Sequence, residues 1–597
     1  MLTKTIQDTY ILWKEQAVSD PDLRAELTAM AGDEARIEDA FYRNLAFGTG
    51  GLRGVIGAGT NRMNVYTVAK ASQGLANYVL STHTAQNNRE SAAPRIAISF
   101  DSRIKSDLFS QIAAGVFAAN GIDVFIYPEL MPTPCLSYAV RALRCDAGIM
   151  VTASHNPSKY NGYKVYGPDG CQITTEAAAA ILKEIEALDP FRDVKQISFE
   201  EGLSNAGRKD TAAGSIEYIG EDVYTAFIEE VKKQSLLGDT PVSRDDAIVY
   251  TPLNGTGLKP VLRALRESGY SNITVVKEQE QPDGHFPTCP YPNPEIREAM
   301  QLGIEYAART GADLLLATDP DCDRVGIAVR APKTEGVAAA SSDGSEAVSP
   351  EDYILLSGNE TGVLLLDYVC SRRQALGTMP EDPVFVKTIV TTDMAERIAE
   401  HYGVRTVNVL TGFKYIGEQI GLLEKAGHAD SYILGFEESY GYLSGNYVRD
   451  KDAVDGAFLI CEMFSYYKSQ GISLPEKLAE LYRTYGYSLN TLHSTEFDGS
   501  EGFRKMQSIM QGFRGESAPT AFGGLAIERA LDYATGIDGL PTSDVLKYFL
   551  EGGTSVVVRP SGTEPKLKVY ISVSAPNKAA AEASEQAIYT DLAARFA

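Results

Sequence analysis

The sequence lacks the features that mark membrane proteins, secreted proteins and disulfide scaffolds. It has no run of roughly 18 or more apolar residues, so no transmembrane helix is predicted. The N-terminal stretch MLTKTIQDTYILWKEQ contains neither a contiguous apolar segment nor a small-residue cleavage site, so no signal peptide is predicted. The seven cysteines are dispersed and form no CxxC pair, which argues against a disulfide framework or a zinc site. We therefore expect a cytoplasmic protein.

Basic residues are also few. The chain has 55 lysines and arginines against 79 acidic residues, which gives a net charge of −24. This charge argues against binding to nucleic acid or to an anionic membrane, because both carry the same sign. An anionic substrate would need a local basic cluster that acts against the overall field.

The length and composition indicate a soluble protein of several domains. A chain of 597 residues is too long for one hydrophobic core, and apolar and charged shares of 44% and 22% are ordinary for a globular protein. Short β-branched runs alternate with helical stretches of a dozen or so residues, which predicts an α/β fold. Strands are expected at 95–100, 122–129, 246–253, 271–278 and 383–390, and helices at 106–121, 257–269, 361–373 and 392–403.

Three apolar strands run into polar loops in the same way. DAGIMV leads into TASHNP, ADLLLA into TDPDCDR, and SYILGF into EESYGY. This order of elements suggests three related α/β units whose loops meet at one cleft, because ligand sites lie beyond the carboxyl ends of strands. Residues 331–350 are small and polar, and are expected to form a flexible surface insertion. Residues 552–574 predict two strands followed by a helix, which forms a different, α+β unit.

The loop TDPDCDR presents three carboxylates after a buried strand. Asp319, Asp321 and Asp323 alternate along the chain, so an extended loop would point them the same way. Three carboxylates in one place repel one another unless a cation neutralises them. A solvated acidic turn is the alternative. The preceding strand and the adjoining Arg324 favour a metal site, with a further oxygen ligand expected.

RPSGTEPK predicts an anion-binding turn. Arg559, the hydroxyls of Ser561 and Thr563, and a glycine that allows close backbone approach would cradle an oxyanion. Lys566 and Lys568 add positive charge. A simple hairpin turn is the alternative, but the arginine and both hydroxyls fall within five residues, which favours phosphate.

Two further loops carry weaker signals. GFEESYGY supplies Glu437 and Glu438, which suit hydrogen bonds from sugar hydroxyls, although charged pairs at strand ends are often only solvated. FGTGGLRG has four glycines around Arg53 but matches neither established nucleotide-binding pattern, so a tight or mobile loop presenting Arg53 is expected.

Ser154 lies in the loop TASHNP, which directly follows the predicted strand GIMV. No GxSxG elbow or hydrolase pattern surrounds it. A serine accompanied by a metal loop, a phosphate cradle and a polyol-binding loop suits phosphoryl transfer, in which positioning and charge neutralisation carry most of the catalysis.

With the motifs TASHNP, DPDxDR, EES and RPSGTEP in this order, the chain resembles the α-D-phosphohexomutase superfamily over essentially its full length. GTGGLRG and GFEESYGY are most similar to its phosphoglucomutase-2-type branch. The resemblance implies four domains around a central cleft, three related α/β units with mixed sheets plus a C-terminal α+β domain. The expected domains are 1–210 with the phosphoserine loop, 211–330 with the metal loop, 331–465 with the sugar loop and 466–597 with the phosphate loop.

The resemblance also implies the roles of individual residues. Ser154 would be the phosphorylated serine, and Mg²⁺ would be held by Asp319, Asp321, Asp323 and the phosphoserine. Glycine is frequent in the family where this chain has Cys322, so the loop backbone must suit a residue with a Cβ. The basic residues near the serine would be Arg53, His155, Lys164 and Arg324. The residues that contact the sugar would be Thr411, Gly412, Lys414, Glu437, Ser439 and Lys451. The residues that contact the distal phosphate would be Arg559, Ser561, Gly562, Thr563 and Lys568.

The implied activity is a phosphomutase. Phospho-Ser154 would donate its phosphoryl group to glucose 1-phosphate or glucose 6-phosphate, and glucose 1,6-bisphosphate would be intermediate and activator. Lys164 or His155 would take the hydroxyl proton, with no choice between them. Mannose or pentose phosphates, a metal-dependent phosphatase and a non-catalytic phosphosugar sensor are the alternatives. A monomer or weak homodimer acting on small-molecule sugar phosphates is expected.

Overall fold

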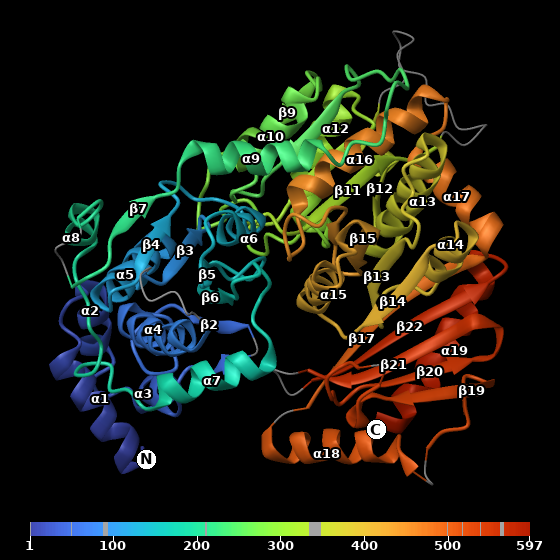
Figure 1. Ribbon diagram of the computed structural model, residues 1–597. Coiled ribbons are helices and arrows are strands. Elements are labelled where there is room, and N and C mark those ends of the chain that lie inside the picture. Colours follow the sequence, from blue (N-terminus) through green and yellow to red (C-terminus); the bar gives the residue numbers. More distant parts are fainter. Residues whose placement is uncertain are drawn as a thin grey trace.

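A computed structural model describes residues 2–48, 50–86, 93–208, 212–332, 348–497, 499–515, 518–537, 539–561 and 566–596. Four β-sheets follow one another along the chain. Figure 1 shows them arranged in an arc, from the blue N-terminal elements through green and yellow to the red C-terminal sheet. No helix in the described ranges is both long and apolar enough to cross a membrane.

The first sheet has seven strands in the order β1-β2-β6-β5-β3-β4-β7. Its strands are β1 Phe47–Gly48, β2 Gly51–Val55, β3 Arg95–Phe100, β4 Asp123–Ile126, β5 Ala147–Val151, β6 Tyr160–Tyr166 and β7 Ile216–Tyr218. The helices of this part are α1 Lys4–Gln16, α2 Pro21–Ala29, α3 Glu34–Phe41, α4 Val65–Gln86, α5 Ser106–Ala119, α6 Thr133–Ala142, α7 Thr175–Glu186 and α8 Phe199–Ser204.

The second sheet has the order β12-β11-β10-β8-β9. Its strands are β8 Ile248–Thr251, β9 Ile273–Val275, β10 Leu314–Thr318, β11 Val325–Arg330 and β12 Tyr353–Leu356, and its helices are α9 Glu221–Lys232, α10 Leu258–Glu267, α11 Lys277–Glu280 and α12 Arg297–Thr310. The domain boundary expected at 330 stays a prediction, but β12 pairs with β11 and so extends this sheet past that residue.

The third sheet has the order β14-β13-β15-β16. Its strands are β13 Val384–Thr388, β14 Arg405–Val409, β15 Tyr432–Glu437 and β16 Gly441–Leu443. The helices of this part are α13 Gly358–Leu376, α14 Met394–His401, α15 Phe413–Lys425, α16 Ala453–Ser469 and α17 Leu474–Tyr485. Helix α16 packs back against α9 and α10 of the second unit, where Figure 1 shows it in orange among green elements.

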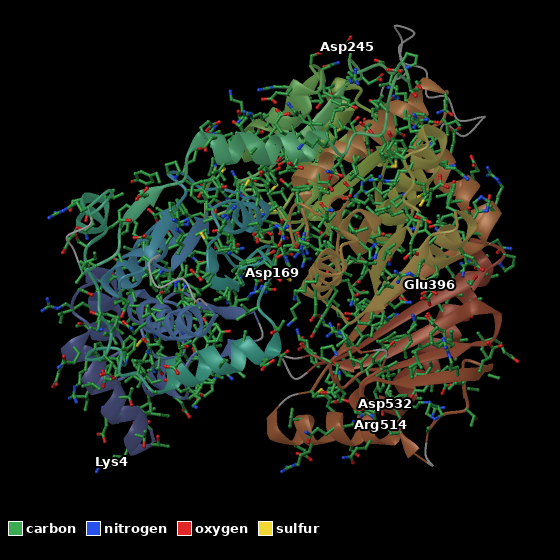
Figure 2. All side chains as sticks on the ribbon, in the orientation of Figure 1. Lys4, Asp169, Asp245, Glu396, Arg514 and Asp532 are labelled. Atoms are coloured by element: carbon green, nitrogen blue, oxygen red, sulfur yellow. The ribbon has the colours of Figure 1, made fainter. Side chains whose placement is uncertain are left out.

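The fourth sheet has the order β17-β22-β21-β20-β19-β18, and its strand pairs are antiparallel. Its strands are β17 Tyr487–Glu496, β18 Ala521–Phe522, β19 Leu525–Asp532, β20 Leu546–Leu550, β21 Thr554–Pro560 and β22 Lys566–Ala575, with helices α18 Gly499–Gly512 and α19 Lys578–Phe596. Beyond α18, Arg514 donates to Asp532 at the end of β19 at 2.7 Å, and Figure 2 labels both residues.

The three predicted α/β units share one strand arrangement. In each, the strand that leads to the polar loop (β5, β10 or β15) lies parallel to β3, β8 or β13 and antiparallel to the following strand, β6, β11 or β16. The interpretation of three related units, the mixed sheets and the separate α+β unit are therefore confirmed. Each expected strand and helix is present, with ends shifted by a few residues. Of the expected insertion 331–350, residues 333–347 lie outside the described part.

Buried apolar side chains connect the first three units extensively and connect the fourth unit to the third by a smaller cluster. One large core cluster runs through the first three units, from Ala97 to Leu481. The fourth sheet has its own core, and a small cluster that includes Ile389, Leu410, Val557 and Tyr570 joins it to the third unit. The fourth unit therefore shares less apolar surface with its neighbours than they share with one another.

Candidate active site

The three strand-end loops meet, as the sequence predicts. The Ser154 hydroxyl donates to Asp319 Oδ2 at 2.8 Å, which joins the first loop to the second. Lys451 Nζ lies 3.0 Å from Asp323 Oδ2, which joins the second loop to the third unit. A cavity of ≈ 580 Å³ opens beside these contacts. His155, Arg324, Glu437, Ser439, Lys451, Arg559 and Lys568 lie in its wall.

A left-handed backbone recurs in the three loops. Ser154 has φ 50°, Cys322 has φ 49° and Tyr440 has φ 65°. A residue with a Cβ is disfavoured in this region by about 1–2 kcal/mol. Each loop therefore turns sharply just beyond its strand. Cys322 adopts a conformation that glycine adopts most easily, and its fully buried side chain is accommodated at that cost.

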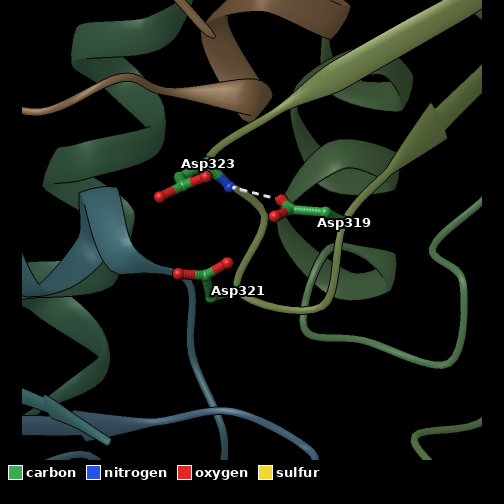
Figure 3. Close-up of side chains that lie close together, drawn as sticks. All are labelled: Asp319, Asp321 and Asp323. Carbon is green, nitrogen blue, oxygen red and sulfur yellow. Dashed lines mark hydrogen bonds between the residues drawn. The ribbon is translucent and has the colours of Figure 1, made fainter. Parts of the chain in front are cut away.

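The aspartate triad forms a compact cluster of oxygens (Figure 3). One carboxylate oxygen of each residue lies within 4.8 Å of those of the other two, and all three side chains are buried. The backbone N–H of Asp323 donates to Asp319 Oδ1 at 3.1 Å, which fixes one carboxylate. Asp321 Oδ1 and Asp323 Oδ1 are buried and have no hydrogen-bond partner in the described part of the chain. Buried acceptors of this kind fit a hard cation with oxygen ligands.

Two lysines balance the charge of the triad. Lys164 Nζ lies 2.7 Å from Asp321 Oδ2 and 3.2 Å from Asp323 Oδ2, and Lys451 Nζ contacts the same Asp323 oxygen. Burial raises the pKa of Asp319, and its two acidic neighbours raise it further. Burial would also raise the pKa of Asp321, but Lys164 and Lys451 outweigh it and hold that pKa below its usual value.

A network that the sequence did not reveal holds Ser154. Its backbone N–H donates to Thr152 Oγ1 at 2.8 Å, and the Thr152 hydroxyl donates to Asp101 Oδ2 at 2.6 Å. Arg103 donates to the Ser154 carbonyl and to the carbonyl of Pro157, at 3.0 Å in the second case. Asp101 and Arg103 follow β3, the parallel neighbour of β5, so their place at the end of a strand was the available signal.

Thr133 reaches the metal loop from the first unit. Its hydroxyl donates to Asp321 Oδ2 at 2.9 Å, and its backbone N–H donates to the Asp321 carbonyl at 3.0 Å. Both residues are completely buried. Sequence reasoning missed Thr133, which follows the β4 strand in the stretch MPTP. The first unit thus contains the serine and also fixes one carboxylate of the triad through Thr133.

The basic residues predicted near the serine lie there. His155 Nδ1 is 3.2 Å from Ser154 Oγ. Burial lowers the pKa of His155 well below its usual value, and Arg324 and Arg53 lower it further, so the ring is neutral at pH 7. Arg53 donates to Asn156 Oδ1 at 3.3 Å. Arg324 pairs with Glu295 at 2.5 Å, and Glu295 is a cavity residue that the sequence did not indicate.

The predicted sugar-contacting loop faces the cavity. Burial raises the pKa of Glu437 to about 7, with Lys451 opposing the shift and Glu438 adding to it. Glu438 Oε2 accepts from the Thr388 hydroxyl at 3.1 Å. Thr411 and Gly412 lie in the cavity wall. Lys414 is not among the wall residues; its ammonium lies 5.0 Å from the centre of the Tyr415 ring.

The fourth sheet supplies part of the cavity wall. Arg559 on β21 pairs in register with Lys568 on β22, and both line the cavity. Arg559 donates to the Tyr570 hydroxyl at 3.2 Å, while its Nε is buried and has no hydrogen-bond partner among the residues that the structure describes. Ser561 donates its backbone N–H to the Lys566 carbonyl at 2.7 Å and is not a wall residue. Gly562 and Thr563 lie outside the described residues.

Comparison with known proteins places this geometry in a family. Four models of phosphoglucomutase/phosphomannomutase domains match in order: α/β/α domains I, II and III at 44–191, 223–333 and 357–485, and the C-terminal domain at 516–589. A phosphoglucomutase of Staphylococcus saprophyticus is 35% identical over 89% of this chain and 91% of its own length. The chain belongs to the phosphoglucomutase/phosphomannomutase family. A phosphoglucomutase of Staphylococcus aureus is also 35% identical, over 95% of this chain and 96% of its own length.

Solved structures of the family share the fold. A phosphoglucomutase/phosphomannomutase family protein from Burkholderia thailandensis superposes with a TM-score of 0.63 at 18% identity, over 92% of this chain and 97% of its own. The open form of parafusin, a phosphoglucomutase from Paramecium, gives a TM-score of 0.64 at 16% identity, over 93% of this chain and 94% of its own. The four-unit arrangement is thus that of the family.

Proposed function

We propose that this chain is a phosphoglucomutase, which interconverts α-D-glucose 1-phosphate and glucose 6-phosphate through a phosphoserine at Ser154. The observation that carries the proposal is the Ser154 hydroxyl bonded to Asp319 beside a cavity whose wall also holds Arg559 and Lys568 of the fourth sheet. A nucleophile on the first unit and cations on the fourth suit a substrate that carries a phosphate and a reacting hydroxyl. The curated relatives named above support glucose as the sugar.

The triad fits a divalent cation. Asp319, Asp321 and Asp323, joined by the phosphate on Ser154, would hold Mg²⁺, which takes oxygen ligands and would neutralise charge on the transferring phosphoryl group when bound. The chain itself contributes the ammonium groups of Lys164 and Lys451, which contact the triad carboxylates. The phosphoryl group on Ser154 would therefore lie among positive charges, although the whole chain has a net charge of −24.

Proton transfer is assigned to His155 in this proposal. When the phosphoryl group passes from Ser154 Oγ to a sugar hydroxyl, the hydroxyl proton needs an acceptor within reach. His155 is neutral and lies beside Ser154, whereas Lys164 is engaged as an ammonium by Asp321 and Asp323. Burial disfavours that ammonium, but the two aspartates outweigh burial and raise its pKa. Lys164 therefore acts as a fixed countercharge.

The bisphosphate intermediate explains the second phosphate site. Glucose 1,6-bisphosphate would turn in the cavity so that its other phosphate faces Ser154, which makes it intermediate and activator. Arg559 and Lys568 would hold whichever phosphate is not reacting, and Glu437 and Ser439 would contact hydroxyls common to both orientations. We further propose that the protein is cytoplasmic and acts as a monomer or weak homodimer.

A coupled assay tests the proposed activity. Glucose 1-phosphate with catalytic glucose 1,6-bisphosphate and Mg²⁺ should yield glucose 6-phosphate without net release of inorganic phosphate. Mannose 1-phosphate and ribose 1-phosphate, assayed in parallel, should turn over more slowly. Equal rates on all three sugars would defeat the glucose preference, and phosphate release without isomerisation would indicate a phosphatase.

Replacing Thr133 by valine should weaken metal binding. The change removes the hydroxyl that fixes Asp321 at almost constant volume, and partners of metal ligands are typically worth about tenfold or more in affinity. Calorimetric titration of Mn²⁺ into the two proteins measures the effect without turnover. Thr133→Ser keeps the hydroxyl and should restore most of the affinity; equal affinity in Thr133→Val would contradict the assignment.

Replacing Arg559 by glutamine should raise the KM for glucose 1-phosphate by about tenfold or more, because a charge-assisted bond to phosphate is lost. Steady-state kinetics measure the effect. Arg529 on β19 is exposed and stacks on Phe549, so Arg529→Gln is the matched control and should leave KM unchanged. An unchanged KM in Arg559→Gln would remove this residue from the phosphate site.

A further inference from the structure

A second cavity, of ≈ 550 Å³, lies in the first unit and shares no wall residue with the active-site cavity. Its walls come from α1, the β1–β2 hairpin, α4, α7 and the segment after α7. Its volume falls in the range of small-molecule sites, about 300–1,000 Å³. Helix α1 precedes the part of the chain that the domain I model matches, so this cavity is built partly outside the matched region.

The wall of this cavity, which we call the N-terminal cavity, is mostly apolar. Leu12, Trp13, Phe47, Leu52, Leu182 and Phe191 supply most of it. Trp13 meets the Phe191 ring edge-on at a centroid distance of 5.4 Å. Such walls favour a ligand with an aromatic or aliphatic body, because binding removes apolar surface of both the wall and the ligand from water.

One cation lies in this wall without a partner. Lys70 of α4 makes no hydrogen bond or ion pair with any part of the chain that the structure describes. Of the two acidic wall residues, Asp189 uses Oδ1 to accept from the Phe191 N–H at 2.8 Å, and Glu186 is exposed. Burial lowers the pKa of Lys70, and Asp189 and Glu186 oppose this shift without cancelling it. An anionic group on a ligand would supply the missing partner.

We propose that the N-terminal cavity binds a small molecule with an apolar, aromatic or aliphatic body and one anionic end, which Lys70 receives. The site is also connected to the serine loop. Phe47 and Leu52 face the cavity and pair with each other across the β1–β2 hairpin. The next residue, Arg53, points to the opposite side of β2 and donates to Asn156. A bound ligand would brace the hairpin that presents Arg53, and this second part rests on the proposed function.

Trp13 provides a local reporter, because it is the single tryptophan of the chain and lies in the cavity wall. The probe is 8-anilinonaphthalene-1-sulfonate, an aromatic body with one sulfonate. Saturable quenching of Trp13 with energy transfer to the dye, at one dye per chain, is expected. Excess glucose 1-phosphate should not displace the dye, since the active-site cavity is separate. No transfer from Trp13, or displacement by the sugar phosphate, would overturn the site.

Variants test the role of the cation. Lys70→Gln should weaken dye binding about tenfold, because a bond to a charged group is lost. Lys14→Gln, an exposed change on α1, should bind the dye as the parent does. Leu12→Gln, at a position 41% exposed and therefore tolerant, should also weaken binding. Unchanged affinity in both Lys70→Gln and Leu12→Gln would refute the proposal.

Kinetics test the connection to Arg53. Dye at saturation should change the KM for glucose 1-phosphate at least about twofold in the parent and leave it unchanged in Lys70→Gln at the same dye concentration. Dye binding with no change in KM would refute the coupling and leave the site standing. Dye binding by a protein without mutase activity would overturn the proposed function alone, because the binding readout uses no substrate.

Discussion

Ser154→Ala is expected to reduce mutase kcat by about four orders of magnitude or more, since removing a catalytic nucleophile typically has an effect of this size. Alanine has no oxygen to carry the phosphoryl group, so the loss should fall on kcat. Binding of glucose 1-phosphate should persist, because Arg559 and Lys568 in the cavity wall are intact. The coupled assay measures kcat, and calorimetric titration measures binding.

Ser158→Ala is the matched control for this change. Ser158 lies in the same loop, is partly buried and has no hydrogen bond in the described structure, so its loss should change kcat little. A phosphatase that uses water as acceptor would keep releasing phosphate in Ser154→Ala. Retained isomerisation in that variant would rule out a phosphoserine mechanism.

Asp393→Asn is expected to destabilise the protein by about 3–5 kcal/mol, because it leaves buried charges without their partner. Asp393, next to α14, accepts from Lys547 of β20 at 2.8 Å, from Lys387 of β13 at 3.1 Å and from Ser555 of β21 at 2.5 Å. Both lysines are almost fully buried. Glu396, labelled in Figure 2, also pairs with Lys387 and would remain. The cluster ties the fourth unit to the third, where the shared apolar surface is small.

Urea denaturation followed by circular dichroism measures this effect as a lower midpoint. Asp382→Asn is the control, because Asp382 pairs with Arg405 at 3.4 Å on the surface and such pairs are worth about 1 kcal/mol or less. Equal midpoints for the two variants would show that the Asp393 cluster is not a stabilising connection.

The same carboxylate predicts how stability depends on pH. Burial would raise the pKa of Asp393, but Lys547 and Lys387 outweigh burial and hold it well below its usual value. A depressed pKa in the folded state contributes stability that is complete above the unfolded value, near pH 4, and is lost as the pH falls below it. Asp393→Asn should therefore lose less stability than the parent between neutral and acid pH, and an equal loss would contradict this origin.

The sequence predicted those parts of the site in which several functional groups stand on one short loop. Asp319, Asp321 and Asp323 follow one strand, and Arg559 stands in a run with two hydroxyls, so their residue types and spacing already indicated the chemistry. The strands β5, β10 and β15 are buried along their whole length, so the polar loops that follow them lie at one edge of each sheet. That is why the meeting of the three loops could be expected.

Isolated residues that contact the site could not be predicted in this way. Thr133 stands alone in its stretch, and its partner Asp321 lies in the second unit, 188 residues further along the chain. Glu295 also stands alone, 29 residues before its partner Arg324 in the same unit. A single threonine or glutamate carries no pattern, so only the folded structure reveals its contact. The left-handed backbone at Cys322 is likewise set by the hairpin geometry and is invisible in the residue itself.

The most direct test of the account is the phosphorylation state of Ser154. The protein is incubated with glucose 1,6-bisphosphate and Mg²⁺, digested and mapped by mass spectrometry, before and after an excess of glucose 1-phosphate. One phosphoryl group on Ser154, acquired from the bisphosphate and exchanged with the monophosphate, is predicted. Isomerisation by a protein that carries no phosphate on Ser154, or carries it on another residue, would contradict the central claim.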